Sequence, residues 1–297
     1  RFGAAAADHG FTGISVSDHF HPWVDAQGNS PLVWSVLGGL ATAAPDARLG
    51  TGVTCPTMRI HPAVIAQAAA TTALMAGGGF FLGVGTGENL NEHVLGDRWP
   101  PADQRLDMLE EAVEVMRALW TGDEVTMVGR HYRVENARLY SCPDEPPPVI
   151  VSAFGLKAAE RAARIGDGLA TTSPDAEVIS RFRESGGSGP VIAFAKVCWG
   201  PDEGLCRELV HHLWPNSGLP GELGQELRTP AVFEQAVELV DVDAAVGAMP
   251  CGPDPEVHAS SIRTFLDAGV DSLHLHQIGS DQEQMYAFYR DEVLPRV

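Results

Sequence analysis

The stretch "FFLGVGTGE", residues 80–88, decides the fold. Its first six residues, 80–85, are apolar or glycine, so a strand here would be covered on both faces. Strands of that kind belong to parallel sheets that have helices packed on each side. The polar residues that follow, ending at Glu88, lie where such a strand ends. The stretch therefore predicts a buried parallel strand that leads into a polar loop.

One unit repeats along the chain, and it consists of a short apolar strand, a polar loop and an amphipathic helix. We predict strands at 12–17, 48–54, 80–85, 148–153, 168–172, 190–198 and 272–278. The helices between them are predicted at 32–44, 62–76, 103–121, 155–165, 175–184, 202–213 and 255–268. Strict alternation of strand and helix predicts a parallel sheet.

The number of units favours a closed barrel over an open, doubly wound sheet, which is the alternative. Residues 2–9 resemble the end of a helix, so we expect the first strand and most of its helix to be missing from the chain as given. That strand would complete a (β/α)₈ TIM barrel. We expect residues 1–297 to form a single domain with a hairpin at about 124–142 and an insertion at about 215–250, which holds a short helix around 230–240.

Composition and charge restrict the function. A formal net charge of −19 disfavours binding to nucleic acid or to an anionic membrane surface. No apolar run is long enough to predict a membrane span. The five cysteines are scattered without a C-x-x-C pair, which favours free thiols and a cytoplasmic location. No spacing of His, Cys, Asp or Glu predicts a metal site.

In a barrel, the loops after the carboxyl ends of the strands carry the chemistry. The loop "SDHFHPW", residues 17–23, follows the first strand and contains His19, which could be a general acid or base. His19 could equally be a hydrogen-bonding loop residue, but its place beside Asp18 and Trp23 favours the catalytic interpretation. Glu88 is the carboxylate expected opposite His19 across the barrel mouth.

Two glycine-containing stretches bear on coenzyme binding. "GVGTGE", residues 83–88, lacks the spacing of a dinucleotide fingerprint, although its glycines would let a flat ring approach the strand end. "SAFGLKAAERAAR", residues 152–164, places small residues before a helix that carries Lys157. This helix start could hold a phosphate, or it could be an ordinary connection.

Several stretches together resemble one family. They are "SDHFHPW" (17–23), "GTGVTCPT" (50–57), "RIHPAVIAQAAAT" (59–71), "FFLGVGTGENLNEHVLGDRWP" (80–100) and "LEEAVEVMRALWTGD" (109–123). The chain resembles the luciferase-like barrel oxidoreductases that use the deazaflavin coenzyme F420, in the branch related to F420-dependent glucose-6-phosphate dehydrogenase. The resemblance covers essentially the whole chain and implies a homodimer.

The resemblance implies roles for individual residues. His19 matches the active-site histidine beside the reactive carbon of the deazaflavin, Trp23 matches an aromatic wall of the substrate pocket, and Glu88 matches a carboxyl group beside the pyrimidine side of the ring. Further matched coenzyme contacts are Asp18, Gly52 and Val53 (the site of a non-prolyl cis peptide), Cys55 and Asn91, with Ser152, Ala153, Phe154 and Gly155 near the coenzyme phosphate.

These residues predict an F420-dependent oxidoreductase that transfers a hydride between the deazaflavin and a small organic substrate. His19 and Glu88 would handle the protons that accompany hydride transfer. Glucose 6-phosphate is disfavoured, because Asp175 and Gln235 are expected where the sugar-phosphate enzymes carry cations. An alcohol, a carbonyl compound or an enone is expected instead. The alternatives are an FMN-dependent monooxygenase that receives reduced FMN from a reductase partner, and a non-catalytic coenzyme-binding barrel.

Overall fold

A single seven-stranded parallel sheet organises the protein. The computed structural model describes residues 1–297. The strands, in their order across the sheet, are β1 (Gly13–Val16), β2 (Arg48–Thr51), β3 (Phe80–Val84), β6 (Val149–Ser152), β7 (Gly168–Thr171), β8 (Val191–Val197) and β9 (Ser272–Gln277). Every neighbouring pair is parallel. All seven predicted strands are confirmed, with shorter bounds.

The sheet curls into a nearly closed barrel. The strands keep their chain order from β1 to β9, whereas a doubly wound sheet reverses direction at a switch point. No backbone ladder joins β1 to β9, but Ser15 Oγ and His274 Nδ1 are hydrogen-bonded across that gap at 2.8 Å. The predicted TIM-barrel class is confirmed.

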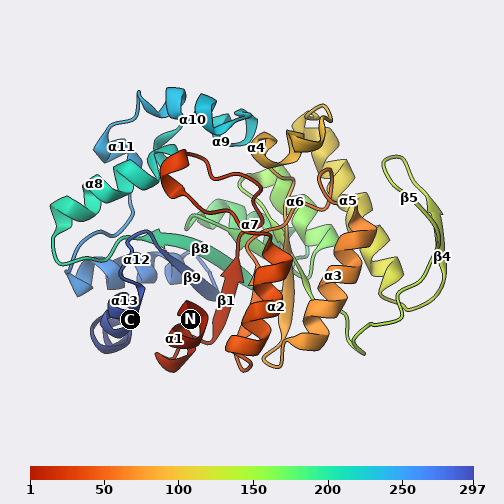
Figure 1. Cartoon of the computed structure of the whole chain (residues 1–297), viewed down its shortest axis with the longest axis horizontal. Coiled ribbons are helices and arrows are strands. Elements are labelled where there is room, and N and C mark those ends of the chain that lie inside the picture. The colour runs from red at the N-terminus through yellow and green to blue at the C-terminus, as the bar shows by residue number, and fades with distance from the viewer.

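Helices cover the outside of the barrel (Figure 1). Those that follow the strands are α2 (Val33–Ala43), α3 (Pro62–Met75), α5 (Ala102–Leu119), α6 (Leu156–Ile165), α7 (Ala176–Glu184), α8 (Glu203–Leu213) and α12 (Pro255–Asp267). The chain starts with α1 (Phe2–Asp8) and ends with α13 (Gln282–Phe288) and two short turns, Tyr289–Val293 and Leu294–Arg296. None of the helices combines the length and the apolar character that crossing a membrane requires.

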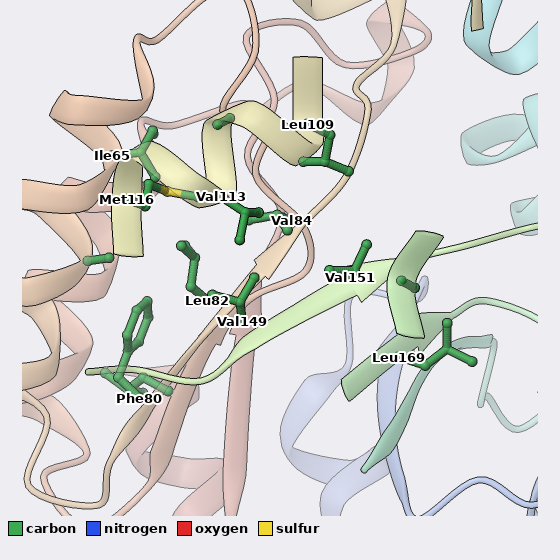
Figure 2. Close-up of a cluster of buried hydrophobic side chains, with 14 of the residues drawn as sticks. Ile65, Phe80, Leu82, Val84, Leu109, Val113, Met116, Val149, Val151 and Leu169 are labelled. Carbon is green, nitrogen blue, oxygen red and sulfur yellow. The ribbon is translucent and has the colours of Figure 1, made fainter. Parts of the chain in front are cut away.

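The main hydrophobic core lies between the strands and this helical layer (Figure 2). Alternate residues of β3 and β6 face the helices, and they pack with residues of α3 and α5. The labelled members in Figure 2 are Ile65, Phe80, Leu82, Val84, Leu109, Val113, Met116, Val149, Val151 and Leu169. The residues between them point into the barrel, so both faces of the central strands are buried, as the apolar stretch at 80–85 predicts.

A smaller apolar cluster fills the barrel interior. It consists of Phe81, Ile150, Ala170 and Ile192, with Phe194 packed against it. Glycines on and directly after β2 make room for these rings, because a Cβ at Gly50 would overlap the Phe81 ring and one at Gly52 would lie 2.8 Å from Phe194 Cε1. Side chains therefore fill the barrel interior below the carboxyl ends of the strands, so a site for a substrate can lie only at the mouth, where those strands end.

Two segments leave the repeat where the sequence predicts. Strands β4 (Val125–Val128) and β5 (Arg133–Ala137) form an antiparallel hairpin, seen at the edge of the molecule in Figure 1. The segment after α8 holds a turn, Pro215–Gly218, and three short helices, α9 (Leu223–Glu226), α10 (Pro230–Val237) and α11 (Val242–Val246). The sequence predicts one helix here, which is α10; α9 and α11 are additional, and α11 begins after Asp241, whose side chain accepts a hydrogen bond from the Ala244 N–H.

The core makes a direct stability prediction. Leu82, labelled in Figure 2, is fully buried, so Leu82→Ala removes packed volume and should lower the free energy of unfolding by about 2–5 kcal/mol. Val128→Ala, on the exposed hairpin at 76% exposure, is the matched control and should change it by less than about 0.5 kcal/mol. Denaturant unfolding measures both, and equal losses in the two variants would contradict this description of the core.

Candidate active site

The predicted catalytic side chains meet at the carboxyl ends of β1 and β3. His19 and Trp23 lie in the loop after β1, and Glu88 precedes α4 (Asn89–Glu92) after β3. His19 Nε2 is 3.6 Å from Glu88 Oε2, and the His19 ring lies 4.2 Å from the Trp23 ring, between centroids. The side chains of His19 and Glu88 keep 17% and 27% of their surface exposed, so a small molecule can reach both.

Asn91 fixes the loop that carries His19. Its Oδ1 accepts hydrogen bonds from the backbone N–H groups of Phe20 (2.9 Å) and His21 (3.1 Å). With Oδ1 so occupied, Nδ2 is the atom that faces His19 Nδ1, at 3.0 Å. Asn91 is 3% exposed, so this contact is shielded from water. A side chain on α4 thereby orients a ring that belongs to the β1 loop.

The surroundings of His19 Nδ1 permit both neutral tautomers. Asn91 Nδ2 is a donor to Nδ1, which leaves the ring proton on Nε2. The carbonyl oxygen of His21, 3.2 Å from Nδ1, is an acceptor, and when Nδ1 donates to it Nε2 carries the lone pair. In the tautomer with the proton on Nδ1, Nε2 can take a proton, and it is the nitrogen that faces Glu88.

Burial shifts the pKa values of the two groups in opposite directions. Desolvation lowers the pKa of His19 to about 4, so the imidazole is neutral at physiological pH. Desolvation raises the pKa of Glu88 to about 8, with an opposing contribution from Lys196 and a smaller raising one from Glu92. Glu88 therefore keeps its proton near neutrality. A neutral base beside a protonated carboxyl group is an arrangement suited to moving two protons.

Lys196 and Trp214 also line the mouth, beside Glu88 and Trp23 respectively. Lys196 Nζ lies 5.0 Å from the centre of the Trp214 ring, and burial lowers the pKa of Lys196 while Glu88 raises it. The Trp214 ring also lies 5.1 Å from that of Trp23 and 5.0 Å from that of His276. The mouth thus combines aromatic walls with one cation. Sequence reasoning missed both residues; a lone charge within the apolar strand 190–198 was the available signal for Lys196.

Below the mouth, Arg59 lies between two buried carboxylates. Arg59 Nη2 is 2.7 Å from Asp18 Oδ1, and the Arg59 backbone N–H donates to Glu92 Oε2 at 2.9 Å. The Thr54 hydroxyl donates to the second oxygen of Asp18. Both oxygens of Asp18 are therefore occupied, and with 4% exposure it lies beneath the mouth. Its predicted contact with the coenzyme ring stays a prediction.

Of the predicted coenzyme contacts that follow β2, some lie at the mouth and one is buried beneath it. Gly52 and Val53 are partly exposed at the mouth, and the peptide bond between them is cis. Cys55 is 5% exposed and its Sγ lies 3.0 Å from Thr57 Oγ1, under the turn at Gly87. Burial, with a smaller contribution from Glu92, raises the pKa of the Cys55 thiol, which stays protonated.

The predicted phosphate segment lies at the start of α6. Ser152 ends β6, Ala153 is buried and bonded to β7 through its backbone, and Phe154 is 56% exposed. Gly155 precedes α6, which has no side-chain cap, whereas an aspartate caps each of the helices α7, α8 and α12. The first N–H groups of α6 are consequently available to an anion.

Two further residues, Asp175 and Gln235, bear on the choice of substrate. The carboxylate of Asp175 caps α7 by accepting from the backbone N–H groups of Glu177 and Val178. Gln235 lies exposed on α10. One oxygen of Asp175, Oδ1, thus serves the helix start, and the expectation that both residues stand at a substrate phosphate site stays a prediction. The remaining cation at the mouth is Lys196.

Comparisons with known proteins agree with this geometry. Residues 1–272 match the family model described as luciferase-like monooxygenase. The chain is 33% identical to an F420-dependent glucose-6-phosphate dehydrogenase of Microbacterium testaceum, covering 100% of this chain and 92% of that protein. It is 35% identical to the F420-dependent hydroxymycolic acid dehydrogenase of Mycobacterium tuberculosis, covering 99% and 82%.

A solved structure extends the likeness to three dimensions. It is an F420-dependent secondary alcohol dehydrogenase in complex with an F420–acetone adduct, with 30% sequence identity, a TM-score of 0.91, and coverage of 100% of this chain and 93% of that one. The fold, the family model and these full-length relatives lead to one conclusion. The chain belongs to the luciferase-like family of barrel oxidoreductases.

Proposed function

We propose that this protein is an F420-dependent dehydrogenase that interconverts a small, uncharged alcohol and its carbonyl compound. The observation that carries the proposal is the His19–Glu88 pair, a neutral imidazole and a protonated carboxyl group 3.6 Å apart at the barrel mouth. Relatives and a solved neighbour that act on hydroxyl groups with F420 support it.

The residues present fit the coenzyme. The partly exposed Gly52–Val53 peptide at the end of β2 offers backbone, rather than a long side chain, to a flat ring at the mouth. The uncapped start of α6 at Gly155 suits its phosphate. When bound, F420 supplies the carbon that accepts or returns the hydride.

The side chains of this chain then manage the protons. For alcohol oxidation, His19 donates from Nδ1 to the His21 carbonyl and takes the hydroxyl proton at Nε2. For carbonyl reduction the steps reverse: the imidazolium, whose Nδ1–H still donates to the His21 carbonyl, returns the proton from Nε2. Glu88 holds the second proton on its carboxyl group, ready to exchange it with the ring.

The lining of the mouth favours an uncharged substrate. Trp23 and Trp214 supply apolar walls, and the single cation, Lys196, already lies over the Trp214 ring and near Glu88. A sugar phosphate carries close to two negative charges, which one such lysine balances poorly. We therefore retain the expectation of an alcohol or carbonyl substrate. A homodimer and a cytoplasmic location, implied by the resemblance, stay predictions.

One titration followed by one turnover assay tests the function. We expect the protein to bind F420 and not FMN, and to change the 420 nm absorbance of F420 with secondary alcohols but not with glucose 6-phosphate. His19→Ala should bind F420 normally and lose about 10²–10⁴-fold in kcat, the usual contribution of an acid–base group. Binding of FMN alone, or turnover by His19→Ala at the normal rate, would reject the proposal.

The pH profile tests the proton assignment. Protonation of His19 below about pH 4 removes the base, and loss of the Glu88 proton above about pH 8 removes the acid. We expect kcat/KM for alcohol oxidation to form a bell between these limits. In Glu88→Gln the alkaline limb should vanish, because an amide does not titrate there. An unchanged alkaline limb in that variant would assign it to another group.

Asn91→Asp tests how the tautomer is controlled. Aspartate keeps the oxygen that binds the Phe20 and His21 N–H groups but replaces the donor at His19 Nδ1 by a negatively charged acceptor. Protonated His19 is stabilised, so the acid limb of the pH profile should move upward by at least one pH unit. Asn29→Asp, which adds the same charge at an exposed position, is the control and should leave the limb in place.

A further inference from the structure

A hollow beside the active site is lined by two positively charged side chains that form no ion pair. Its lining, which we name the arginine hollow, consists of Asn89, Gly96, Asp97, Arg98, Trp99 and Arg228. Most of these residues belong to the loop between β3 and α5, whereas Arg228 comes from the insertion just after α9. Helices α4 and α9 lie side by side here (Figure 1).

The two arginines of the hollow are exceptional among the basic residues of this acidic chain. Only five of the 20 Lys and Arg side chains have no carboxylate within 4.0 Å. Three of the five have other partners: Arg48 and Lys196 lie over aromatic rings, and Arg138 donates to the Gly122 carbonyl. Arg98 and Arg228 have none of these partners, and both line the hollow.

The carboxylate nearest to Arg228 in sequence is occupied elsewhere. Glu226 Oε1 accepts from Arg105 Nη1 and from Trp99 Nε1, each at 3.1 Å. The Arg105 guanidinium also lies 4.3 Å from the centre of the Trp99 ring, and the Asn89 amide donates to the Glu226 carbonyl oxygen. These contacts fix the wall of the hollow while leaving both exposed guanidinium groups free. Asp97 is the one carboxylate in the lining.

The hollow adjoins the proposed coenzyme site. Asn89 directly follows Glu88, and α4 also carries Asn91, which orients the catalytic loop. On the other side, the start of α5 is joined to the start of α6 by the Lys157–Asp103 ion pair, beside the uncapped Gly155. Trp99 leads into α5. When a phosphate is held at the start of α6, an anionic chain attached to that phosphate therefore extends into the neighbourhood of the arginine hollow.

We propose that the arginine hollow binds the carboxylate groups of the oligoglutamate tail of F420. The inference rests on the proposed function. A protein with a net charge of −19 repels a polyanion unless cations are concentrated locally, and two unpaired guanidinium groups provide forked donors matched to carboxylates. The hollow would thus select the coenzyme by its tail and leave hydride transfer to the mouth.

The test varies the tail and the arginines together. Fluorescence titration measures Kd for F420 bearing several glutamates and for the form that lacks glutamates, in the wild-type protein, in Arg98→Gln/Arg228→Gln and in Arg138→Gln. We expect the double variant to bind the long-tailed form about 5- to 20-fold more weakly, and the tail-less form less than about 2-fold more weakly. Arg138→Gln, which removes an exposed arginine far along the chain in the hairpin region, should match wild type. Added salt should reduce the preference for the long tail.

Each alternative outcome has its own meaning. If the double variant loses the same affinity for both coenzyme forms, or loses none for either, the tail site is overturned. The proposed function stands in that case, because the protein still binds F420. An unchanged coenzyme Kd with a raised KM for the alcohol substrate would instead assign the hollow to the substrate and also overturn the proposal. Failure of the wild-type protein to bind either form would reject the proposed function itself.

Discussion

The pairing of Arg59 with Asp18 and Glu92 is the interaction on which the rest of the site depends. It joins the loops after β1, β2 and β3, and all three side chains are nearly buried, with 8% of the Arg59 side chain and 1% of each carboxylate side chain exposed. Removing one member of such a group leaves an uncompensated charge in a medium of low dielectric. The loops are therefore held together by charges that water cannot easily replace.

The buried group of Arg59, Asp18 and Glu92 fixes the positions of the residues above it at the barrel mouth. Glu92 ends α4, so the helix that positions Asn91 and follows Glu88 is anchored to Arg59 from below. Asn91 then holds the backbone after His19 and meets its ring. With the geometry fixed, partial burial shifts the pKa values of His19 and Glu88 in opposite directions, because desolvation disfavours the charged form of each.

Sequence reasoning succeeded where a local pattern carries the information. Glu88 was placed at the mouth because polar residues follow an apolar strand, and His19 for the same reason. It failed where the decisive contact is tertiary or where a local role was overlooked. Asp175, for example, also caps α7, a local role that the family resemblance alone does not indicate. Lys196 was treated as part of an apolar strand, although its register with His276 on β9 turns it toward the mouth.

The sequence by itself determined the alternation of strands and helices, and hence which residues lie at the carboxyl ends of the strands, because periodicity and strand-end polarity are properties of neighbouring residues. Only the tertiary structure decided which of these side chains meet. His19 and Asn91 are 72 positions apart, and Arg98 and Arg228 line one hollow only because the insertion packs its helix α9 against α4. Such contacts depend on how the barrel curls and how its loops pack, which no local pattern specifies.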